Sequence, residues 1–180
     1  MRIISGRLGG RRFLPPAHMP HTRPTTDIAK EGLFNILQHR LDFSTIHTLD
    51  LFAGTGSISY ELASRGTSQL TLVEKDLQQV QFIKKTLAAF AIQNASVMKQ
   101  DVFQFLQQCT QTFDFIFAGP PYALTSIDEL PKIIMSRNLI SPGGLFVLEH
   151  TSWNDYQSFT GFERERNYGT TVFSFFVPSH

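Results

Sequence analysis

A short glycine-containing loop is the first segment of this sequence whose residue types could perform chemistry. Residues 49–56, with the sequence LDLFAGTG, lie where an apolar run ends and a helical pattern begins. In an open α/β sheet, the carboxyl end of a strand is where ligands bind. Gly54 and Gly56 permit a tight turn and a close approach of the backbone to a ligand. The segment therefore predicts a ligand-binding loop.

The residues around this loop indicate which ligand it takes. A dinucleotide-binding loop follows the pattern G-x-G-x-x-G, but here Ser59 occupies the third glycine position. Asp50 stands just before the loop, where its carboxylate would repel a pyrophosphate and attract an ammonium group. The chain also has no G-x-x-x-x-G-K-[ST] phosphate-binding motif. We therefore expect a cationic ligand that carries an amino-acid group.

Two more carboxylates end the next two expected strands. Glu74 follows Gly56 by 18 residues, which is about where an acidic residue binds both hydroxyls of a ribose. Asp101 can accept a hydrogen bond from an adenine amine or cap the helix that begins at Val102, and these two roles are compatible. Both positions favour a nucleoside as the other part of the ligand.

A rigid turn follows the fourth expected strand. Residues 117–122 read FAGPPY, and the two prolines remove two backbone donors and fix the turn. We expect the carbonyl groups of Gly119 and Pro120 to be held toward the ligand crevice. Tyr122 offers a flat face on which a base can stack. The alternative is a purely structural turn that ends the strand and carries a surface tyrosine.

These segments must be positioned by alternating strands and helices. The expected strands are Ile46 to Phe52, Gln69 to Glu74, Ala95 to Lys99, Phe113 to Ala118 and Leu145 to Glu149. The expected helices are Ile58 to Arg65, Leu77 to Phe90, Val102 to Gln108 and Ile127 to Arg137. Such alternation predicts right-handed βαβ units and a parallel sheet covered on both faces. Phe162 to Tyr168 and Thr171 to Val177 have no helix between them and predict a terminal antiparallel hairpin.

The N-terminal segment is basic. Residues 1–26 contain no acidic residue and five arginines, whose planar guanidinium groups suit phosphates and base edges. This indicates a nucleic-acid-binding arm, and a solvated basic terminus is the alternative. We expect short paired strands at residues 2–4 and 12–14, followed by a helix that Asp27 caps. The arginines expected to bind RNA are Arg2, Arg7, Arg11, Arg12 and Arg23.

Length and composition exclude several classes of protein. The 180 residues, 42% hydrophobic and 17% charged, are typical of one globular domain and exclude a disordered or fibrous chain. The apolar runs are too short to span a bilayer, and the first residues lack the apolar core of a signal peptide. A single cysteine, Cys109, cannot form an internal disulfide. We therefore expect a cytoplasmic protein with no membrane partner.

Nearly the whole chain resembles the RsmD family of class I S-adenosylmethionine-dependent methyltransferases. The glycine loop is specific only to the superfamily, whereas its combination with the Arg-Pro-Thr segment and the Pro-Pro-Tyr turn is more specific. The matching segments are RIISG at 2–6, GRR at 10–12, TRPT at 22–25, EGLFNIL at 31–37, DLFAGTG at 50–56, SRG at 64–66, VEKD at 73–76, PPY at 120–122, PGG at 142–144, EH at 149–150 and RNYG at 166–169.

This resemblance implies a fold and an activity. The fold is a Rossmann-like α/β class I methyltransferase, with a mostly parallel seven-stranded sheet that ends in an antiparallel hairpin and with an N-terminal β-hairpin arm. The cofactor is S-adenosylmethionine, the product is S-adenosylhomocysteine, and the acceptor is the exocyclic N2 amine of a guanine in bacterial 16S ribosomal RNA. We expect residues 1–26 to form an RNA-binding extension and residues 27–180 to form the methyltransferase domain.

The resemblance also assigns roles to residues. Asp50, Gly54 and Gly56 would contact the methionine end of the cofactor, Glu74 the ribose and Asp101 the adenine. The full set of expected cofactor-binding residues is Asp50, Phe52, Ala53, Gly54, Thr55, Gly56, Glu74, Lys75, Asp101 and Val102. The expected catalytic residues are Gly119, Pro120, Pro121 and Tyr122, and no metal ion is expected. We expect a monomer that acts on 16S ribosomal RNA within a 30S subunit or an assembly intermediate.

Gly119 departs from the family pattern, in which the turn begins with Asp. The lone pair of a guanine amine is delocalised into the ring, so attack on a methyl group needs acceptors that hold the N–H bonds. Losing one positioned polar group of this kind typically lowers a rate on the order of 10² to 10³-fold. Two alternatives therefore stay open: a catalytically silent cofactor- and RNA-binding homologue, and an amine methyltransferase acting on DNA adenine or protein glutamine. His150 either shapes the pocket or has a structural role.

Overall fold

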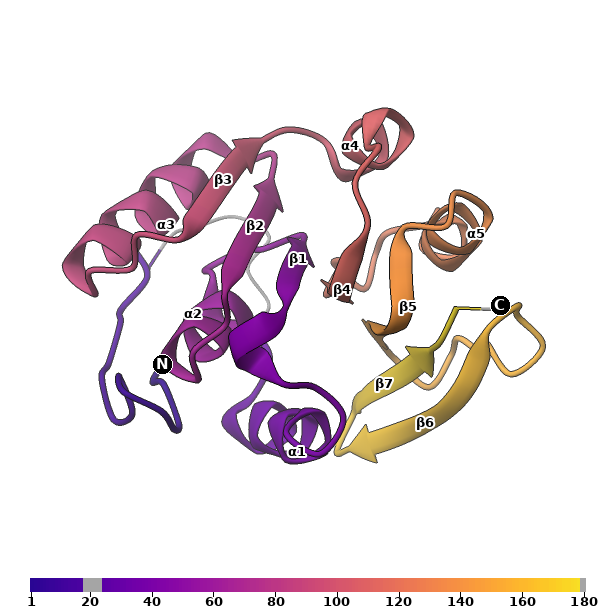
Figure 1. Ribbon diagram of the computed structural model, residues 1–180, viewed down its shortest axis with the longest axis horizontal. Coiled ribbons are helices and arrows are strands. Elements are labelled where there is room, and N and C mark those ends of the chain that lie inside the picture. Colours follow the sequence, from indigo (N-terminus) through magenta and orange to yellow (C-terminus); the bar gives the residue numbers. More distant parts are fainter. Residues whose placement is uncertain (18–23, 179–180) are drawn as a thin grey trace.

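The fold is a single sheet with helices on both faces. The computed structural model describes residues 1–17 and 24–178. Its seven strands have the order β3-β2-β1-β4-β5-β7-β6, and β3, β2, β1, β4 and β5 are parallel neighbours. β7 pairs antiparallel with both β5 and β6 (Figure 1). The expected fold class is confirmed: a mostly parallel sheet that ends in an antiparallel hairpin.

The elements match the hydrophobic periodicity of the sequence closely. The strands are β1 (His47–Leu51), β2 (Gln69–Glu74), β3 (Ala95–Lys99), β4 (Phe113–Ala118), β5 (Ile140–His150), β6 (Phe162–Tyr168) and β7 (Thr171–Phe176). The helices are α1 (Asp27–Leu37), α2 (Ser57–Ser64), α3 (Leu77–Ala89), α4 (Val102–Gln108) and α5 (Glu129–Ser136), with a 3-10 turn at Phe43–Thr45. β5 begins earlier than expected, at Ile140, and the register between it and β4 shifts near Phe113.

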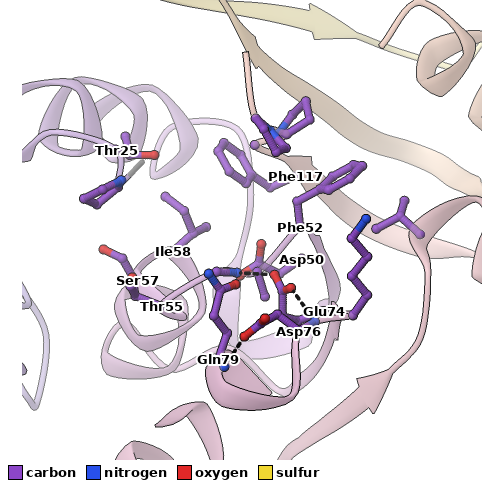
Figure 2. A pocket seen from close by; sticks show the side chains of 18 of the residues that line it. Thr25, Asp50, Phe52, Thr55, Ser57, Ile58, Glu74, Asp76, Gln79 and Phe117 are labelled. Carbon is purple, nitrogen blue, oxygen red and sulfur yellow. Dashed lines mark hydrogen bonds between the residues drawn. The ribbon is translucent and has the colours of Figure 1, made fainter. Parts of the chain in front are cut away.

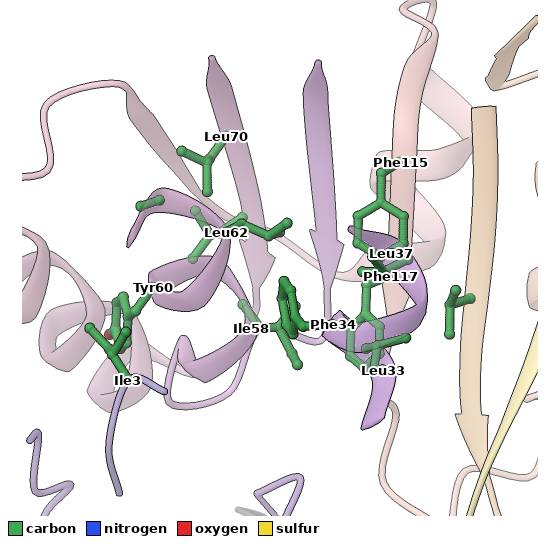
Figure 3. Packing of buried hydrophobic residues seen from close by; sticks show 14 of the residues in the cluster. Ile3, Leu33, Phe34, Leu37, Ile58, Tyr60, Leu62, Leu70, Phe115 and Phe117 are labelled. Carbon is green, nitrogen blue, oxygen red and sulfur yellow. The ribbon is translucent and has the colours of Figure 1, made fainter. Parts of the chain in front are cut away.

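Two apolar cores lie on the two faces of the sheet. One contains Leu33 and Phe34 of α1 together with Ile58 of α2 and Ile83 of α3 (Figure 3). The other contains residues of α4 and α5, including Leu106. Burying both faces explains why β4 is an almost uninterrupted apolar run and why β1 is buried from Thr48 to Leu51. The cores hold the strand ends in place, so the loops that follow them converge at one edge of the sheet.

The first helix begins one residue earlier than expected. Thr26 is the N-cap of α1, and its side chain accepts a hydrogen bond from the Ala29 backbone N–H at 3.2 Å. The prediction that Asp27 caps this helix was therefore wrong. Asp27 is the first helical residue, where a negative charge favours the helix dipole. Its carboxylate accepts a hydrogen bond from the Arg2 guanidinium instead, at 3.1 Å.

The N-terminal segment forms the expected hairpin, but only a short one. Arg2 and Arg12 form an antiparallel bridge, and the backbone N–H groups of Ile3 and Phe13 donate to the carbonyl oxygens of Arg11 and Met1, at 2.9 and 3.0 Å. The backbone N–H groups of Ile4 and Ser5 are instead bound by the carboxylate of Glu61 on α2, at 2.8 and 3.1 Å. The chain beyond Ile3 is therefore held by α2, and the hairpin prediction is confirmed with shorter strands than expected.

Apolar side chains fasten this segment to the main core. Ile3, Leu8 and Phe13 are buried in the cluster that also contains Tyr60, and the ring of Phe13 meets that of Tyr60 edge-on at 5.0 Å. Figure 3 shows Ile3 lying against Tyr60. The segment is therefore packed against α2 as part of the body. Within residues 1–17 and 24–178, no helix has the length and apolar content needed to cross a membrane.

Candidate functional site

A cavity of about 620 Å³ opens at the carboxyl ends of β1, β2, β3 and β4. Its volume lies within the usual range for small-molecule sites. Of the expected cofactor-binding residues it is lined by Asp50, Phe52, Ala53, Gly54, Thr55, Glu74, Lys75, Asp101 and Val102. Gly119, Pro120 and Pro121 of the expected catalytic turn line it as well. Carboxylates separated by 51 residues along the chain thus meet in one cavity, because parallel strands end at the same edge.

Asp50 is the most deeply buried carboxylate of the cavity, with 2% of its surface exposed. Burial raises its pKa to about 7, although a hydrogen bond from the Ser59 hydroxyl, at 2.7 Å, opposes the shift. The charge of Glu74 adds a smaller increase to the pKa of Asp50. A carboxylate in this state gains much from a cationic partner, because the partner offsets the cost of its ionisation. The site therefore favours a ligand that carries a positive charge.

Glu74 ties the glycine loop to the start of α3. Its Oε1 accepts a hydrogen bond from the Gly54 N–H and its Oε2 accepts one from the Asp76 N–H, both at 2.9 Å. Asp76 in turn caps α3 by accepting from the Gln79 N–H (Figure 2). Each carboxylate oxygen of Glu74 keeps a further lone pair. The carboxylate is thus held in one orientation and can still accept from two neighbouring hydroxyls.

Asp101 has the helix-capping role considered from the sequence. Its Oδ1 accepts hydrogen bonds from the N–H groups of Phe103 and Gln104, at 2.9 and 3.1 Å. Both bonds use the same oxygen, and Asp101 also lines the cavity. A second role in binding an amine is therefore compatible with the cap, as expected. Gly56 is the one expected cofactor residue that does not line the cavity; it is the N-cap of α2.

The expected RNA-binding arginines have different surroundings. Arg2 is engaged by Asp27, and the Arg11 guanidinium lies 4.9 Å from the centre of the Phe90 ring. Arg7 and Arg12 are exposed, and in the part of the chain that the structure describes neither guanidinium forms an ion pair. Arg23 lies outside the described residues.

His150 is a fully buried side chain that does not line the cavity. Its Nδ1 lies 2.6 Å from the Thr151 carbonyl oxygen and must donate, so Nε2 accepts from the Ser174 hydroxyl at 2.7 Å. Burial lowers the pKa of this imidazole, which favours the neutral ring. These contacts favour the structural role among the two that the sequence left open.

Comparison with known proteins identifies the family. A family model described as "Conserved hypothetical protein 95" matches residues 1–177. The Escherichia coli K12 protein named Ribosomal RNA small subunit methyltransferase D is 32% identical over 149 residues, which are 83% of this chain and 74% of that protein. The chain belongs to the RsmD family.

Solved structures agree with this family assignment. A hypothetical protein of Thermus thermophilus superimposes with a TM-score of 0.85 at 29% identity, covering 98% of each chain. The Thermus thermophilus 16S rRNA N2 methyltransferase RsmC, solved in complex with AdoMet and guanosine, gives a TM-score of 0.67 at 26% identity. That match covers 86% of this chain and 44% of RsmC. The fold is that of the class I methyltransferases.

The cavity fits the cofactor that the RsmD family implies. S-adenosylmethionine carries an ammonium group and a sulfonium, and the buried carboxylate of Asp50 provides an anionic partner. The fixed carboxylate of Glu74 suits the ribose hydroxyls, and the apolar side chains of Phe52, Leu77 and Val102 suit the flat adenine. Lys75 and Lys99 also line the cavity, so its walls are not purely acidic.

The turn that was expected to be catalytic has no carboxylate at position 119. Gly119 has no side chain, and a Cβ at this position would lie 3.1 Å from the Phe117 ring and 3.7 Å from Oε1 of Glu149. Pro120 is buried, and Tyr122 is 37% exposed and does not line the cavity. The structure therefore brings three of the four expected catalytic residues to the cavity and leaves the tyrosine at the surface nearby.

Several cavity residues were not predicted from the sequence. Those on neighbouring loops, such as Asp76 and Leu124, could have been found from their position beside the predicted strand ends. Thr25 could not be found in this way, because it precedes the first helix and is far from the strand ends in sequence; its only signal was its place in the TRPT segment. The lining residues not predicted are Pro24, Thr25, Ser57, Ile58, Asp76, Leu77, Gln79, Lys99, Phe117 and Leu124.

The glycines of the loop differ in how strictly they exclude a side chain. Gly56 has a φ of +86°, and a Cβ there would lie 2.5 Å from the Tyr60 ring. Gly54 has a φ of +59°, but its nearest such contact is 3.8 Å. We expect Gly56→Ala to lower the free energy of unfolding by about 1 to 3 kcal/mol, from backbone strain together with a displaced buried ring.

Chemical denaturation will measure this effect. Gly54→Ala is the matched control, since it adds the same methyl group in a left-handed conformation without the clash, and its cost should be about 1 kcal/mol. Equal losses in the two variants would contradict the steric role of Tyr60.

Proposed function

We propose that this protein transfers a methyl group from S-adenosylmethionine to the exocyclic N2 amine of a guanine in 16S ribosomal RNA. The observation that carries the proposal is that one cavity is lined both by Asp50 and Glu74 and by Gly119–Pro121. The binding of AdoMet and guanosine by RsmC, and the name of the Escherichia coli relative, support this substrate.

The residues of the chain bind the cofactor and orient the guanine. S-adenosylmethionine, when bound, supplies an electrophilic methyl group on a sulfonium. Asp50, Gly54 and Glu74 hold the cofactor, while Tyr122 stacks on a guanine extruded from its RNA surroundings. The carbonyl groups of Gly119 and Pro120 accept hydrogen bonds from the guanine amine. The amine nitrogen forms the new N–C bond as the C–S bond breaks, its electron pair passes to sulfur, and the amine proton leaves to water.

The test is methyl transfer to 30S subunits from cells that lack the modification. We expect turnover with one methyl group on N2 of a guanine, and a roughly 10- to 100-fold lower rate for Tyr122→Ala, since base stacking on an aromatic ring contributes about 1 to 3 kcal/mol. The affinity for S-adenosylmethionine should not change in this variant. Tyr122→Phe is the control, because it keeps the flat ring.

Two results would favour the other candidates. Cofactor binding without turnover would favour a catalytically silent homologue that binds the cofactor and RNA. The observation that favours this candidate is the absence of a carboxylate at Gly119. Transfer to adenine in DNA or to a protein glutamine, with no transfer to 30S subunits, would change the substrate. Purified 16S ribosomal RNA, assayed beside 30S subunits, distinguishes free RNA from an assembled particle.

We assign an RNA-binding extension to residues 1–26 and the methyltransferase domain to residues 27–180. The exposed side chains of Arg7 and Arg12 support the first assignment, and the buried side chains of Ile3, Leu8 and Phe13 hold the basic segment against the body of the protein. A monomer acting in the cytoplasm, where ribosomal RNA is processed, completes the proposal.

The RNA-binding assignment predicts a salt dependence. Five phosphate contacts would give a slope of log affinity against log salt near −4, at about 0.7 to 0.9 per contact. We expect the double variant Arg7→Gln, Arg12→Gln to reduce the steepness of this slope by about 1.5, because both side chains are exposed and form no ion pair within the described ranges. Lys132→Gln, which changes an exposed side chain of α5, is the control. An unchanged slope in the double variant would remove these arginines from the RNA interface.

A further inference from the structure

Position 119 lacks a side chain, but a buried carboxylate lies directly behind it. Glu149, near the end of β5, is 1% exposed, and its Oε1 is 3.7 Å from where a Cβ at position 119 would stand. This distance is an ordinary van der Waals contact, so an aspartate at 119 would meet Glu149. The carboxylate of the turn is thus absent, while another one faces the same place from the neighbouring strand.

The same oxygen of Glu149 binds a residue of the cavity wall. The Thr25 hydroxyl donates a hydrogen bond to Oε1 of Glu149, at 2.5 Å. Thr25 lines the cavity together with Gly119 and Pro120. In Figure 2, Thr25 and Phe117 lie in the upper part of the view, whereas Glu74 and Asp76 lie in the lower part. Thr25 therefore belongs to the part of the cavity beside the turn, away from the proposed ribose site.

The hydrogen bond determines what the Thr25 hydroxyl can still do. A hydroxyl group has one proton and two lone pairs, and here the proton is donated to a carboxylate. The oxygen then has only acceptor capacity left for a ligand. A charged hydrogen-bond partner also polarises the hydroxyl and strengthens it as an acceptor. An oxygen of this kind beside the turn can hold an N–H bond of an amine.

We propose that the Thr25 hydroxyl, oriented by Glu149, replaces the side-chain acceptor that the turn lacks at Gly119 and holds one N–H bond of the substrate amine, while the carbonyl groups of the turn hold the other. Thr25 would touch the substrate, and Glu149 would be a positioning residue that acts through Thr25. This inference rests on the proposed amine methyltransferase function. No proton is transferred to Thr25, because the amine proton leaves to water after the N–C bond has formed.

Single-turnover methyl transfer to 30S subunits, at saturating S-adenosylmethionine, tests this role. Thr25→Val keeps the shape of the side chain but removes the acceptor, and we expect its rate to fall on the order of 10²-fold. Thr25→Ser keeps the hydroxyl and should stay within several-fold of the wild-type rate. Glu149→Gln should lower the rate by at least about 10-fold, since the hydroxyl loses its charged partner. Calorimetry with S-adenosylmethionine should give affinities within about twofold of wild type for all three.

A rescue variant separates this role from a structural one. Gly119→Asp, introduced into the Thr25→Val protein, places a carboxylate on the turn and should restore at least about 10-fold of the lost rate, with a small shift of the Phe117 ring. A structural defect at Thr25 would not be repaired in this way. Equal rates for wild type and Thr25→Val, a Thr25→Ser rate as low as that of Thr25→Val, or no rescue would each overturn the inference and leave the proposed function intact. A wild-type protein without turnover would overturn both.

Discussion

Asp50→Asn will make the ligand-free protein more stable above pH 7 and will weaken its binding of S-adenosylmethionine on the order of 100-fold. Asp50 is 2% exposed, and burial raises its pKa to about 7. An asparagine has nearly the same shape and can still accept from the Ser59 hydroxyl, but it carries no charge to bury. The gain in the free energy of unfolding should be a few kcal/mol, at about 1.4 kcal/mol per unit of pKa shift.

The stability gain must depend on pH with a definite sign. Between about pH 4 and pH 7, Asp50 holds a proton in the folded chain but not in the unfolded chain, because its ordinary value is 3.8. The folded state then binds more protons, so the wild-type free energy of unfolding decreases as the pH rises through this window. In Asp50→Asn the free energy of unfolding does not decrease for this reason. The two proteins should therefore differ little near pH 4 and most above pH 7.

The affinity for S-adenosylmethionine should fall in Asp50→Asn, although the free energy of unfolding rises. Removing one partner of a desolvated charge pair typically costs about 2 to 5 kcal/mol of binding free energy. Calorimetry at pH 8 measures this, and the wild-type affinity should itself decrease below pH 7 as Asp50 becomes protonated. Asp155→Asn, at an exposed carboxylate outside the cavity, is the control with the same change of net charge. A pH-independent stability difference, or full affinity in Asp50→Asn, would contradict the proposed role of Asp50.

Glu61→Ala will destabilise the protein by about 3 to 5 kcal/mol and lower its Tm on the order of 10 °C. Glu61 is fully buried on α2 and accepts hydrogen bonds from Ile4 N, Ser5 N and Arg65 Nε, at 2.8, 3.1 and 2.9 Å. Its Oε1 also lies 3.7 Å from Nζ of Lys30, which is 1% exposed. Truncation leaves a buried cation and two backbone donors of the N-terminal segment without this acceptor.

The ionic state of Lys30 explains part of this cost. Burial lowers the pKa of Lys30, and Glu61 is the largest influence that opposes the shift. Without Glu61, the lysine must either remain charged in an apolar site or lose its proton, and both alternatives cost stability. The loss should be smaller at high pH, where the unfolded lysine also becomes neutral.

Thermal unfolding of two further variants tests whether the buried Glu61 and Lys30 network stabilises the protein. Glu163→Ala removes the exposed partner of Arg40, an ion pair with a 2.6 Å contact, and should cost no more than about 1 kcal/mol. Replacing the buried pair by apolar residues, as in Lys30→Met with Glu61→Leu, should recover part of the stability lost in Glu61→Ala. A Glu61→Ala protein as stable as Glu163→Ala would show that the buried network contributes little.

The order and type of the elements, and most of the candidate site, could be predicted from the residues alone. Hydrophobic periodicity and helix caps such as Asp101 are local signals, so the bounds of β2, β3 and β4 were predicted to the residue. The parallel order follows from the alternation of strands with helices. That order brings Asp50, Glu74 and Asp101 to one edge, which explains why nine of the ten expected cofactor residues line one cavity.

The contacts of the N-terminal segment, in contrast, depend on long-range packing. Local pairing predicts a hairpin at residues 2–14, and a short one forms, but its strands end early because Glu61 of α2 binds the N–H groups of Ile4 and Ser5. Thr25 and Glu149 are 124 residues apart, and no local pattern connects a threonine before the first helix with an acid at the end of the fifth strand. Such contacts form because packing of the two cores brings residues that are distant in sequence to the same edge of the sheet. They are long-range outcomes of packing, which periodicity in a single sequence does not encode.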